Sequence, residues 1–124
     1  MKAGGRMVIQ DNRFQQLLVG EELSGVTFVR DYLQLQFNAP LLNAYTPVTV
    51  QRGDHRAVFG ETVFANLLIG QIGKVVRSAG LRADEALDIT FDDNSKILIS
   101  LRPEDYVVPE AIMLSGRNGE CIVI

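Results

Sequence analysis

The sequence of 124 residues is poor in the residues on which several specialised protein classes depend. Cys121 is the only cysteine, so no disulfide can form within the chain. His55 is the only histidine, and a zinc site or a nucleophile–histidine pair would have to be built around it. The sequence has no Lys-Ser or Lys-Thr pair, so the motif of a phosphate-binding loop, a glycine-rich segment followed by such a pair, is absent. The sequence therefore predicts no metal site, no bound cofactor and no catalytic residue.

An excess of charge is also lacking. The 12 basic and 15 acidic residues leave a net charge of −3, which argues against binding to nucleic acid or to an anionic membrane. The richest apolar stretch, residues 63–76, is interrupted by Asn66, Gln71 and Lys74, unlike a membrane span. Residues 1–7 are too short and polar for the apolar core of a secretory signal. Together with the single thiol, these features predict a cytoplasmic protein.

A short motif occurs twice in the chain. The segment FQQLLVG at 14–20 returns as FANLLIG at 64–70. Each copy places its phenylalanine and leucines on one face of a helix, and its glycine can end that helix in the left-handed conformation. Asp11 or Asn12 can cap the first helix. We expect an internal repeat over 11–52 and 61–111 with an exposed linker at 51–56; the alternative is chance similarity of two amphipathic segments.

Alternating sequences predict antiparallel strands. LQLQF at 33–37 and LDITF at 87–91 place their apolar side chains on one face. A polar turn leads into a strand at 97–101, and Asn118-Gly119 predicts a hairpin turn with positive φ at both residues. The sequence thus predicts an α+β fold in one domain, 1–124. We expect two pseudo-repeated halves, each a short helix followed by antiparallel strands, in a curved sheet or half-barrel, plus a C-terminal hairpin at 111–124.

His55, Cys121 and the last strand have plain structural interpretations. His55 lies in the charged segment RGDHR at 52–56, which is typical of a solvated loop. Cys121 falls in a predicted strand, where we expect it to pack as a small hydrophobic side chain. The apolar residues 122–124 form either a core strand or an exposed edge that pairs with a second copy in a homodimer.

The segment 100–111 is the best candidate for a binding site. Pro103 and Pro109 stiffen its backbone, and rigid loops that gather charged and aromatic side chains often carry recognition residues. The predicted binding residues are Arg102, Glu104, Asp105, Tyr106 and Glu110. One alternative is a structural turn in which Arg102 pairs with a nearby glutamate, Glu104 or Glu110. Another is an acid–base pair of carboxyl groups whose pKa values are separated by burial.

The turn FDDNS at 91–95 is followed by a strand and by a loop that runs from ED at 104–105 to PEA at 109–111. This series resembles a family of small uncharacterised bacterial proteins with a strand, an F-D-D-x-S turn, a strand and an E-D…P-E-A loop. The resemblance covers mainly residues 64–111. Asn94 and Val108 stand where the family usually has glycine. The resemblance implies a bacterial origin and brings no established activity.

These features favour a non-enzymatic binding module that engages another protein or a second copy of the chain. An immunity protein that blocks a basic toxin is one version, because a small acidic domain complements a basic surface. The alternative is a small-molecule sensor or carrier with a groove between the two halves, lined by Tyr32, Tyr45 or Tyr106. An enzyme would require Asp54 and His55 to converge with Glu104 or Asp105.

Overall fold

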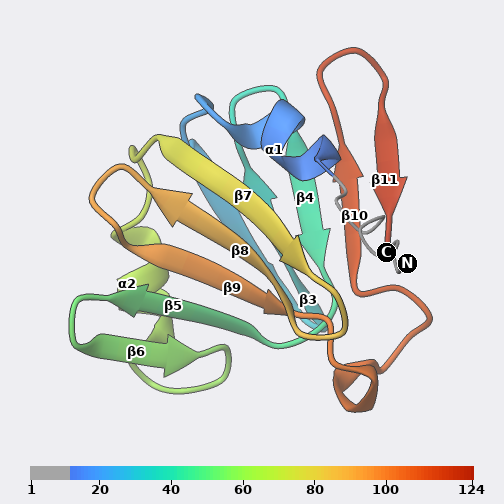
Figure 1. The fold of residues 1–124 in the computed structure, drawn as a ribbon. Helices are drawn as coiled ribbons and strands as arrows, with labels where there is room; N and C mark the ends of the chain where they lie inside the picture. The colour runs from blue at the N-terminus through green and yellow to red at the C-terminus, as the bar shows by residue number, and fades with distance from the viewer. Residues whose placement is uncertain (1–11) are drawn as a thin grey trace, which may run out of the picture.

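The computed structural model describes residues 12–124 and contains two five-stranded antiparallel sheets with two short helices (Figure 1). The elements are α1 (Arg13–Leu18), β2 (Gly25–Val29), β3 (Tyr32–Gln36), β4 (Leu41–Ala44), β5 (Val48–Arg52), β6 (His55–Val58), α2 (Phe64–Ile69), β7 (Val76–Arg82), β8 (Ala86–Phe91), β9 (Lys96–Ser100), the 3-10 turn η2 (Pro103–Asp105), β10 (Ile112–Ser115) and β11 (Cys121–Val123). We call the sheet β11-β10-β4-β3-β2 sheet A and the sheet β6-β5-β9-β8-β7 sheet B.

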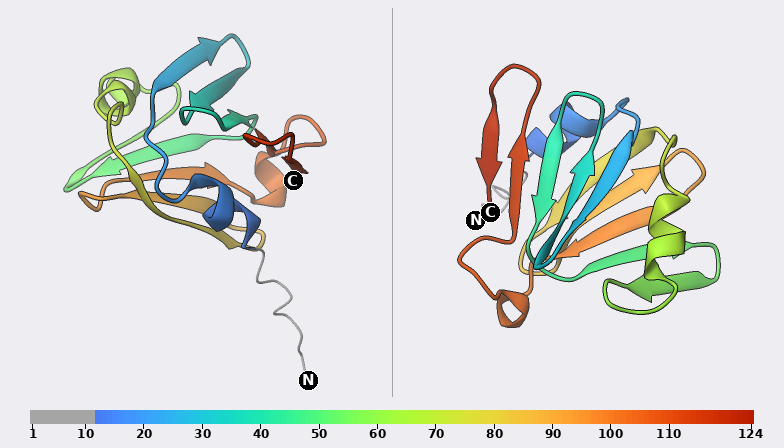
Figure 2. Two further views of the ribbon diagram at one scale, coloured as in Figure 1. Left: turned by 90° about the horizontal axis from the view of Figure 1, so that it is seen from above. Right: turned by 180° about the vertical axis from the view of Figure 1, so that it is seen from behind.

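The two sheets lie in layers with one hydrophobic core between them (Figure 2). Leu33 and Leu35 of β3 are fully buried, while Gln34 between them points to the other face. Ile97 and Ile99 of β9 enter the same core from sheet B. The alternation of apolar and polar residues along strands such as β3 and β9 thus turns one face of each sheet to the core and the other away from it.

The two helices predicted from the repeated motif are confirmed. Phe14 and Leu18 of α1 are buried, and so are Phe64 and Leu68 of α2. Helix α1 packs on β7, and α2 packs on β5 and β6. The predicted cap is wrong for Asn12, whose side chain makes no capping hydrogen bond. Asp11, the other predicted cap, lies outside the described residues.

The glycines that follow the two helices have different conformations. Gly20 has φ +88°, as predicted, and its N–H donates to the carbonyl of Val76 at 2.9 Å. Gly70 has φ −64°, so the prediction of a left-handed residue there is wrong. The chain after α2 continues through further turns before the left-handed Gly73. At Gly70 a Cβ would instead meet the guanidinium of Arg52 at 2.7 Å.

The expected linker at 51–56 is wrong, because this segment is the tip of a hairpin. Strands β5 and β6 are paired, with Arg52 opposite His55. Gly53 has φ +59°, which suits the first position of a two-residue hairpin turn. The other edge of β5 pairs with β9, so the charged segment belongs to sheet B.

The C-terminal hairpin is confirmed, with β11 paired to β10 at the edge of sheet A. Residues 116–120 connect the paired Ser115 and Cys121, so the turn is longer than the predicted two residues. Of Asn118 and Gly119 only Gly119 has a positive φ, so the predicted turn geometry is wrong for Asn118. Cys121 is exposed, which corrects the prediction that it packs in the core. The register places Cys121 opposite Ser115 on the outer face, and the next residue, Ile122, is buried instead.

The α+β class is confirmed, whereas the expected single curved sheet or half-barrel is not. The strands form two separate sheets and do not close into a barrel. Strands β2, β3 and β4 follow α1 and share sheet A with the hairpin β10-β11, which comes late in the chain after α2. Strands β7, β8 and β9 follow α2 and share sheet B with the hairpin β5-β6, which comes after α1. Within residues 12–124, no helix has the length and apolarity required to cross a membrane.

Candidate functional site

Strands β5, β9 and β8 run side by side in sheet B (Figure 1). A hollow of about 350 Å³ lies on the outer face of this sheet. We call it the arginine hollow. Its lining is Pro47, Thr49, Arg56, Val58, Arg82, Glu85, Ala86, Leu98, Ser100, Arg102 and Asp105. Apolar side chains and charged ones thus line the same space.

The strand registers explain why these residues share the hollow. Thr49 pairs with Val58 on one side and with Leu98 on the other. Ala86 pairs in the same way with Ser100 and with Arg82. Since paired residues project to the same face, the five strands carry these side chains in two adjacent rows. Their neighbours along each strand face the core.

Ser100 holds the 3-10 turn η2 against the end of β9. Its hydroxyl donates to a carboxylate oxygen of Asp105 at 2.6 Å and accepts the backbone N–H of Arg102 at 3.2 Å. Proline occupies the first position of the turn, where its fixed φ costs nothing. The backbone that carries Arg102 is therefore fixed at both ends of the short turn.

The three arginines of the hollow have different partners. Arg82 donates to Glu85 at 2.7 Å and to Asp88 at 2.8 Å, and the hydrogen bond to Asp88 is the main cause of its raised pKa. Within residues 12–124, Arg56 donates only to the neutral amide of Gln51, at 3.3 Å. The guanidinium of Arg102 has no hydrogen-bond or ion-pair partner within residues 12–124. Two cationic groups of the hollow therefore lack a carboxylate partner in this part of the chain.

A second hollow, of about 340 Å³, adjoins the same turn. Its lining is Asp84, Leu101, Pro103, Tyr106, Val108 and Pro109, and we call it the proline hollow. Asp84, in the turn between β7 and β8, is the only charged residue in the described part of this lining. The side chain of Val108 is 42% exposed, and that of the preceding residue, Val107, is 79% exposed.

The structure places three of the five predicted binding residues in the two hollows. Arg102 and Asp105 line the arginine hollow, and Tyr106 lines the proline hollow. Glu104 is exposed and Glu110 is half-buried, and neither lines these two hollows. The alternative in which Arg102 pairs with one of these glutamates is not seen, because no such ion pair occurs among the described residues.

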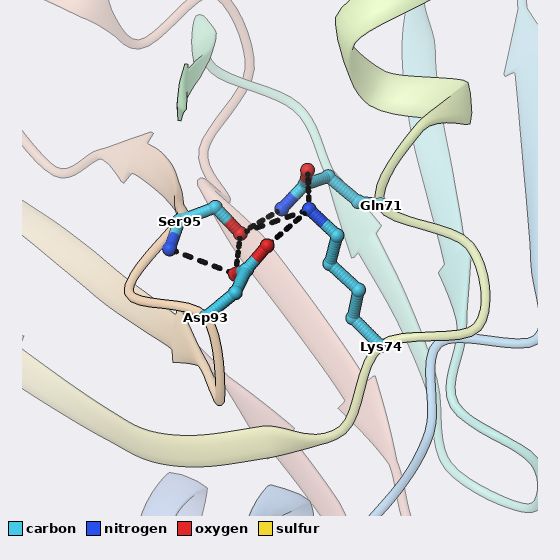
Figure 3. A network of polar contacts seen from close by, with 4 residues as sticks. All are labelled: Gln71, Lys74, Asp93 and Ser95. Atoms are coloured by element: carbon cyan, nitrogen blue, oxygen red, sulfur yellow. Dashed lines mark hydrogen bonds and ion pairs between the residues drawn. The ribbon is translucent and has the colours of Figure 1, made fainter. Parts of the chain in front are cut away.

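A polar network that the sequence analysis did not predict connects α2 to the β8–β9 turn (Figure 3). The amide of Gln71, which is fully buried, donates to the hydroxyl of Ser95 at 2.7 Å and accepts from Lys74 at 2.9 Å. Lys74 also forms an ion pair with Asp93 at 2.6 Å. The hydrogen bonds from Lys74 and from Ser95 hold the pKa of Asp93 well below its usual range.

The network borders a third hollow of about 480 Å³, which we call the histidine hollow. Its lining is Arg52, Gly53, His55, Leu67, Asp93 and Ser95. His55 thus lines a different hollow from Asp105, so the structure does not bring together the groups that the enzyme hypothesis requires. Within residues 12–124, no three His, Cys, Asp or Glu side chains are grouped as metal ligands would be.

Of the tyrosines expected to line a groove between the halves, two lie together and the third lies elsewhere. The rings of Tyr32 and Tyr45 contact each other, with centroids 5.1 Å apart, while Tyr106 lines the proline hollow. The arginine hollow does combine both predicted halves, since Pro47 and Thr49 come from 11–52 and most of its other residues from 61–111.

Arg56 and Arg82 are the site residues that the sequence analysis missed. Arg56 was assigned to the linker, and Arg82 lies in a strand whose alternation is weak. Recognition of the Gly53-Asp54 turn would have placed Arg56 two residues before Val58 on one strand face. That signal was present in the sequence.

No family model matches the chain, and no curated protein or solved structure is significantly similar to it. The resemblance of residues 64–111 to small bacterial proteins therefore stays a prediction from their motifs.

Proposed function

We propose that the protein is a non-enzymatic binding module, and that a partner protein inserts a carboxylate side chain into the arginine hollow. The observation that carries the proposal is that Arg56 and Arg102 line one hollow and neither has a carboxylate partner within residues 12–124. Each guanidinium presents several N–H donors in a fixed plane and binds a carboxylate through paired hydrogen bonds.

The surroundings of the two arginines favour such binding. Leu98 and Val58 exclude part of the water from the hollow, which strengthens an ion pair formed there. The η2 turn is held by Ser100, so less conformational entropy is lost when Arg102 is fixed by a partner.

The test is a titration followed by amide chemical shifts, with an N-acetylated, C-amidated Gly-Glu-Gly peptide as the probe. We expect saturable shifts at residues of the arginine hollow, and a loss of affinity of about tenfold in each of Arg56→Gln and Arg102→Gln. The matched control is Arg30→Gln, which removes an arginine outside the hollow. The Arg30 side chain is 94% exposed, and its contact with Asp31 is long, at 4.0 Å. Equal affinity of all four proteins for the peptide rules the proposal out.

A small-molecule sensor or carrier is the second candidate. It is supported by the lining of the arginine hollow, which both predicted halves supply. In this version the two halves are duplicated units, and the hairpin of each half pairs with the three strands of the other half. The two sheets have the same arrangement, a hairpin beside three consecutive strands, which agrees with such a duplication. Native mass spectrometry of gently purified protein tests it: an added mass of a few hundred daltons that Arg102→Gln removes favours the carrier, and an unmodified mass favours the protein-binding module.

The immunity version assigns binding to the acidic side chains of the 100–111 segment instead. Glu104 is exposed and available to a basic partner surface. The double variant Glu104→Lys, Glu110→Lys tests this version with a Gly-Lys-Gly peptide as the probe. Unchanged affinity of the variant for that peptide excludes it and leaves the arginine hollow as the proposed site.

A further inference from the structure

We propose that the arginine hollow and the proline hollow act as one composite site for a peptide segment in which an apolar side chain is adjacent to a carboxylate. The proposal rests on the proposed function, since the carboxylate is the group assigned there to Arg56 and Arg102. It adds the second pocket, the apolar neighbour and the extended shape of the ligand.

The two hollows share the same two stretches of backbone. Along residues 100–106 the arginine hollow takes Ser100, Arg102 and Asp105, while the proline hollow takes Leu101, Pro103 and Tyr106. At the β7–β8 turn the division is repeated, with Glu85 in the first hollow and Asp84 in the second. The η2 turn is therefore a common wall, and the proposed ligand lies across it with one side chain in each hollow.

The proline hollow fits an apolar side chain. Within residues 12–124, its lining consists of Asp84 and of two prolines, a tyrosine, a leucine and a valine. The two prolines stiffen the wall of this hollow, so little conformational entropy of the protein is lost when a ligand side chain binds there. Val108 is 42% exposed here, so a ligand side chain would remove apolar surface from water.

Charge complementarity determines the second group of the ligand. Arg82 is already bonded to Glu85 and Asp88, and the other charged lining residues are Arg56, Arg102 and Asp105. The carboxylate of Asp105 already accepts a hydrogen bond from Ser100. With Asp88 counted, the three arginines are balanced by Glu85, Asp88 and Asp105. The guanidinium groups of Arg56 and Arg102 nevertheless bond to no carboxylate within residues 12–124, and an anionic side chain next to the apolar one would pair with them.

Synthetic peptides test the composite site directly. The first probe is an N-acetylated, C-amidated peptide of glycine and serine with a central Phe-Glu pair; the second replaces Phe by Ser, and the third replaces Glu by Gln. We expect the first to bind at least about tenfold more tightly than either of the others, as judged by amide chemical-shift titration. Equal affinities of the first and second peptides overturn the proposal.

Two matched pairs of variants locate the contacts. Val108→Asp places a charge in the proline hollow, whereas Val107→Asp adds the same charge at a neighbouring side chain that is 79% exposed and outside the lining. Arg102→Gln is compared with Arg30→Gln. We expect Val108→Asp and Arg102→Gln each to weaken binding of the Phe-Glu peptide about tenfold, and the two controls to leave it unchanged. Circular dichroism verifies that all four variants are folded.

The outcomes separate the two proposals. If Arg102→Gln weakens binding and Val108→Asp acts like Val107→Asp, the composite site is wrong and the carboxylate-binding hollow stands. If Val108→Asp alone weakens binding, the ligand is recognised as an apolar group and the proposed carboxylate contact is wrong. If no variant changes the affinity, both proposals fail.

Discussion

The ammonium group of Lys74 lies 2.6 Å from the carboxylate of Asp93, and the two residues connect the turn after α2 to the β8–β9 turn (Figure 3). Lys74 is the largest cause of the lowered pKa of Asp93, and Ser95 is the second. Solvent reaches the ion pair mainly at Asp93, whose side chain is 50% exposed, while that of Lys74 is 20% exposed.

Asp93 should make the stability of the protein depend on acid. Its pKa is lower in the folded chain than in the unfolded one, whose value is about 3.9. The carboxylate therefore stabilises the fold fully above that value, and this contribution is lost as the pH falls below it. We expect Asp93→Asn to lower the free energy of unfolding at pH 7 by about 1 kcal/mol, because solvent screens the exposed half.

The measurement is urea unfolding at several pH values between neutral and acid. The difference between the wild type and Asp93→Asn should shrink below about pH 4. Asp92→Asn is the control, since the Asp92 side chain has no hydrogen bond or ion pair within the described residues. A difference that does not change with pH contradicts the assignment of the stabilisation to the charged form of Asp93.

Gln71 should contribute more to stability than an ordinary surface glutamine. Its side chain is fully buried and bonded to Ser95 and Lys74. Gln71→Ala leaves the Ser95 hydroxyl without this donor and opens a small cavity, so we expect a loss of about 2 kcal/mol in thermal or chemical unfolding. Gln16→Ala, on the exposed side of α1, should change stability by less than about 0.5 kcal/mol. Equal effects of both variants would show that the buried network adds no stability.

Gly20 and Gly70 occupy equivalent positions of the repeated motif but should respond differently to alanine. Gly20→Ala forces an L side chain to φ +88° and should cost about 1 kcal/mol. Gly70 has a helical φ of −64°, and the group that its new Cβ would meet is the movable end of Arg52. We expect Gly70→Ala to be within about 0.5 kcal/mol of the wild type in urea unfolding. A larger loss at Gly70 than at Gly20 contradicts this account.

The exposed edge of β11 should be the contact between copies if the protein is a homodimer. Val123 is 51% exposed, and in the described chain β11 has no strand on its outer side. We expect light scattering after gel filtration to report a dimer that Val123→Lys converts to a monomer, because a lysine on an edge strand opposes pairing. A wild type that is monomeric at all concentrations disproves the dimer.

Cys121 gives an independent readout of that contact. Its thiol is exposed on β11 and should react with a thiol reagent in the folded protein. If copies pair through β11, labelling should be slower at high protein concentration in the wild type and independent of concentration in Val123→Lys. The same concentration dependence in both proteins would exclude β11 as the interface.

Local patterns were enough to predict the elements whose stabilising contacts are close in sequence. The helices of the FxxLLxG motif and the strands around 33–37 and 87–91 follow from spacing alone, because helices and strands orient side chains with fixed periods. The loop around Arg102 was recognised in the same way, from two prolines and a cluster of charged residues. The hairpin at 48–58 was missed only because its Gly53-Asp54 turn was interpreted as a linker.

The sequence by itself determined the α+β class, the amphipathic strands and the rigid turn that presents Arg102. The tertiary structure alone decided that β5 and β6 join β9 and that β10 and β11 join β4, because strand pairing depends on contacts between residues far apart in the chain. That pairing brings Arg56 into the hollow with Arg102 and leaves Cys121 on the outer face. The physical reason is that a side-chain period specifies which face is apolar, while only packing of the complete core specifies which strands become neighbours.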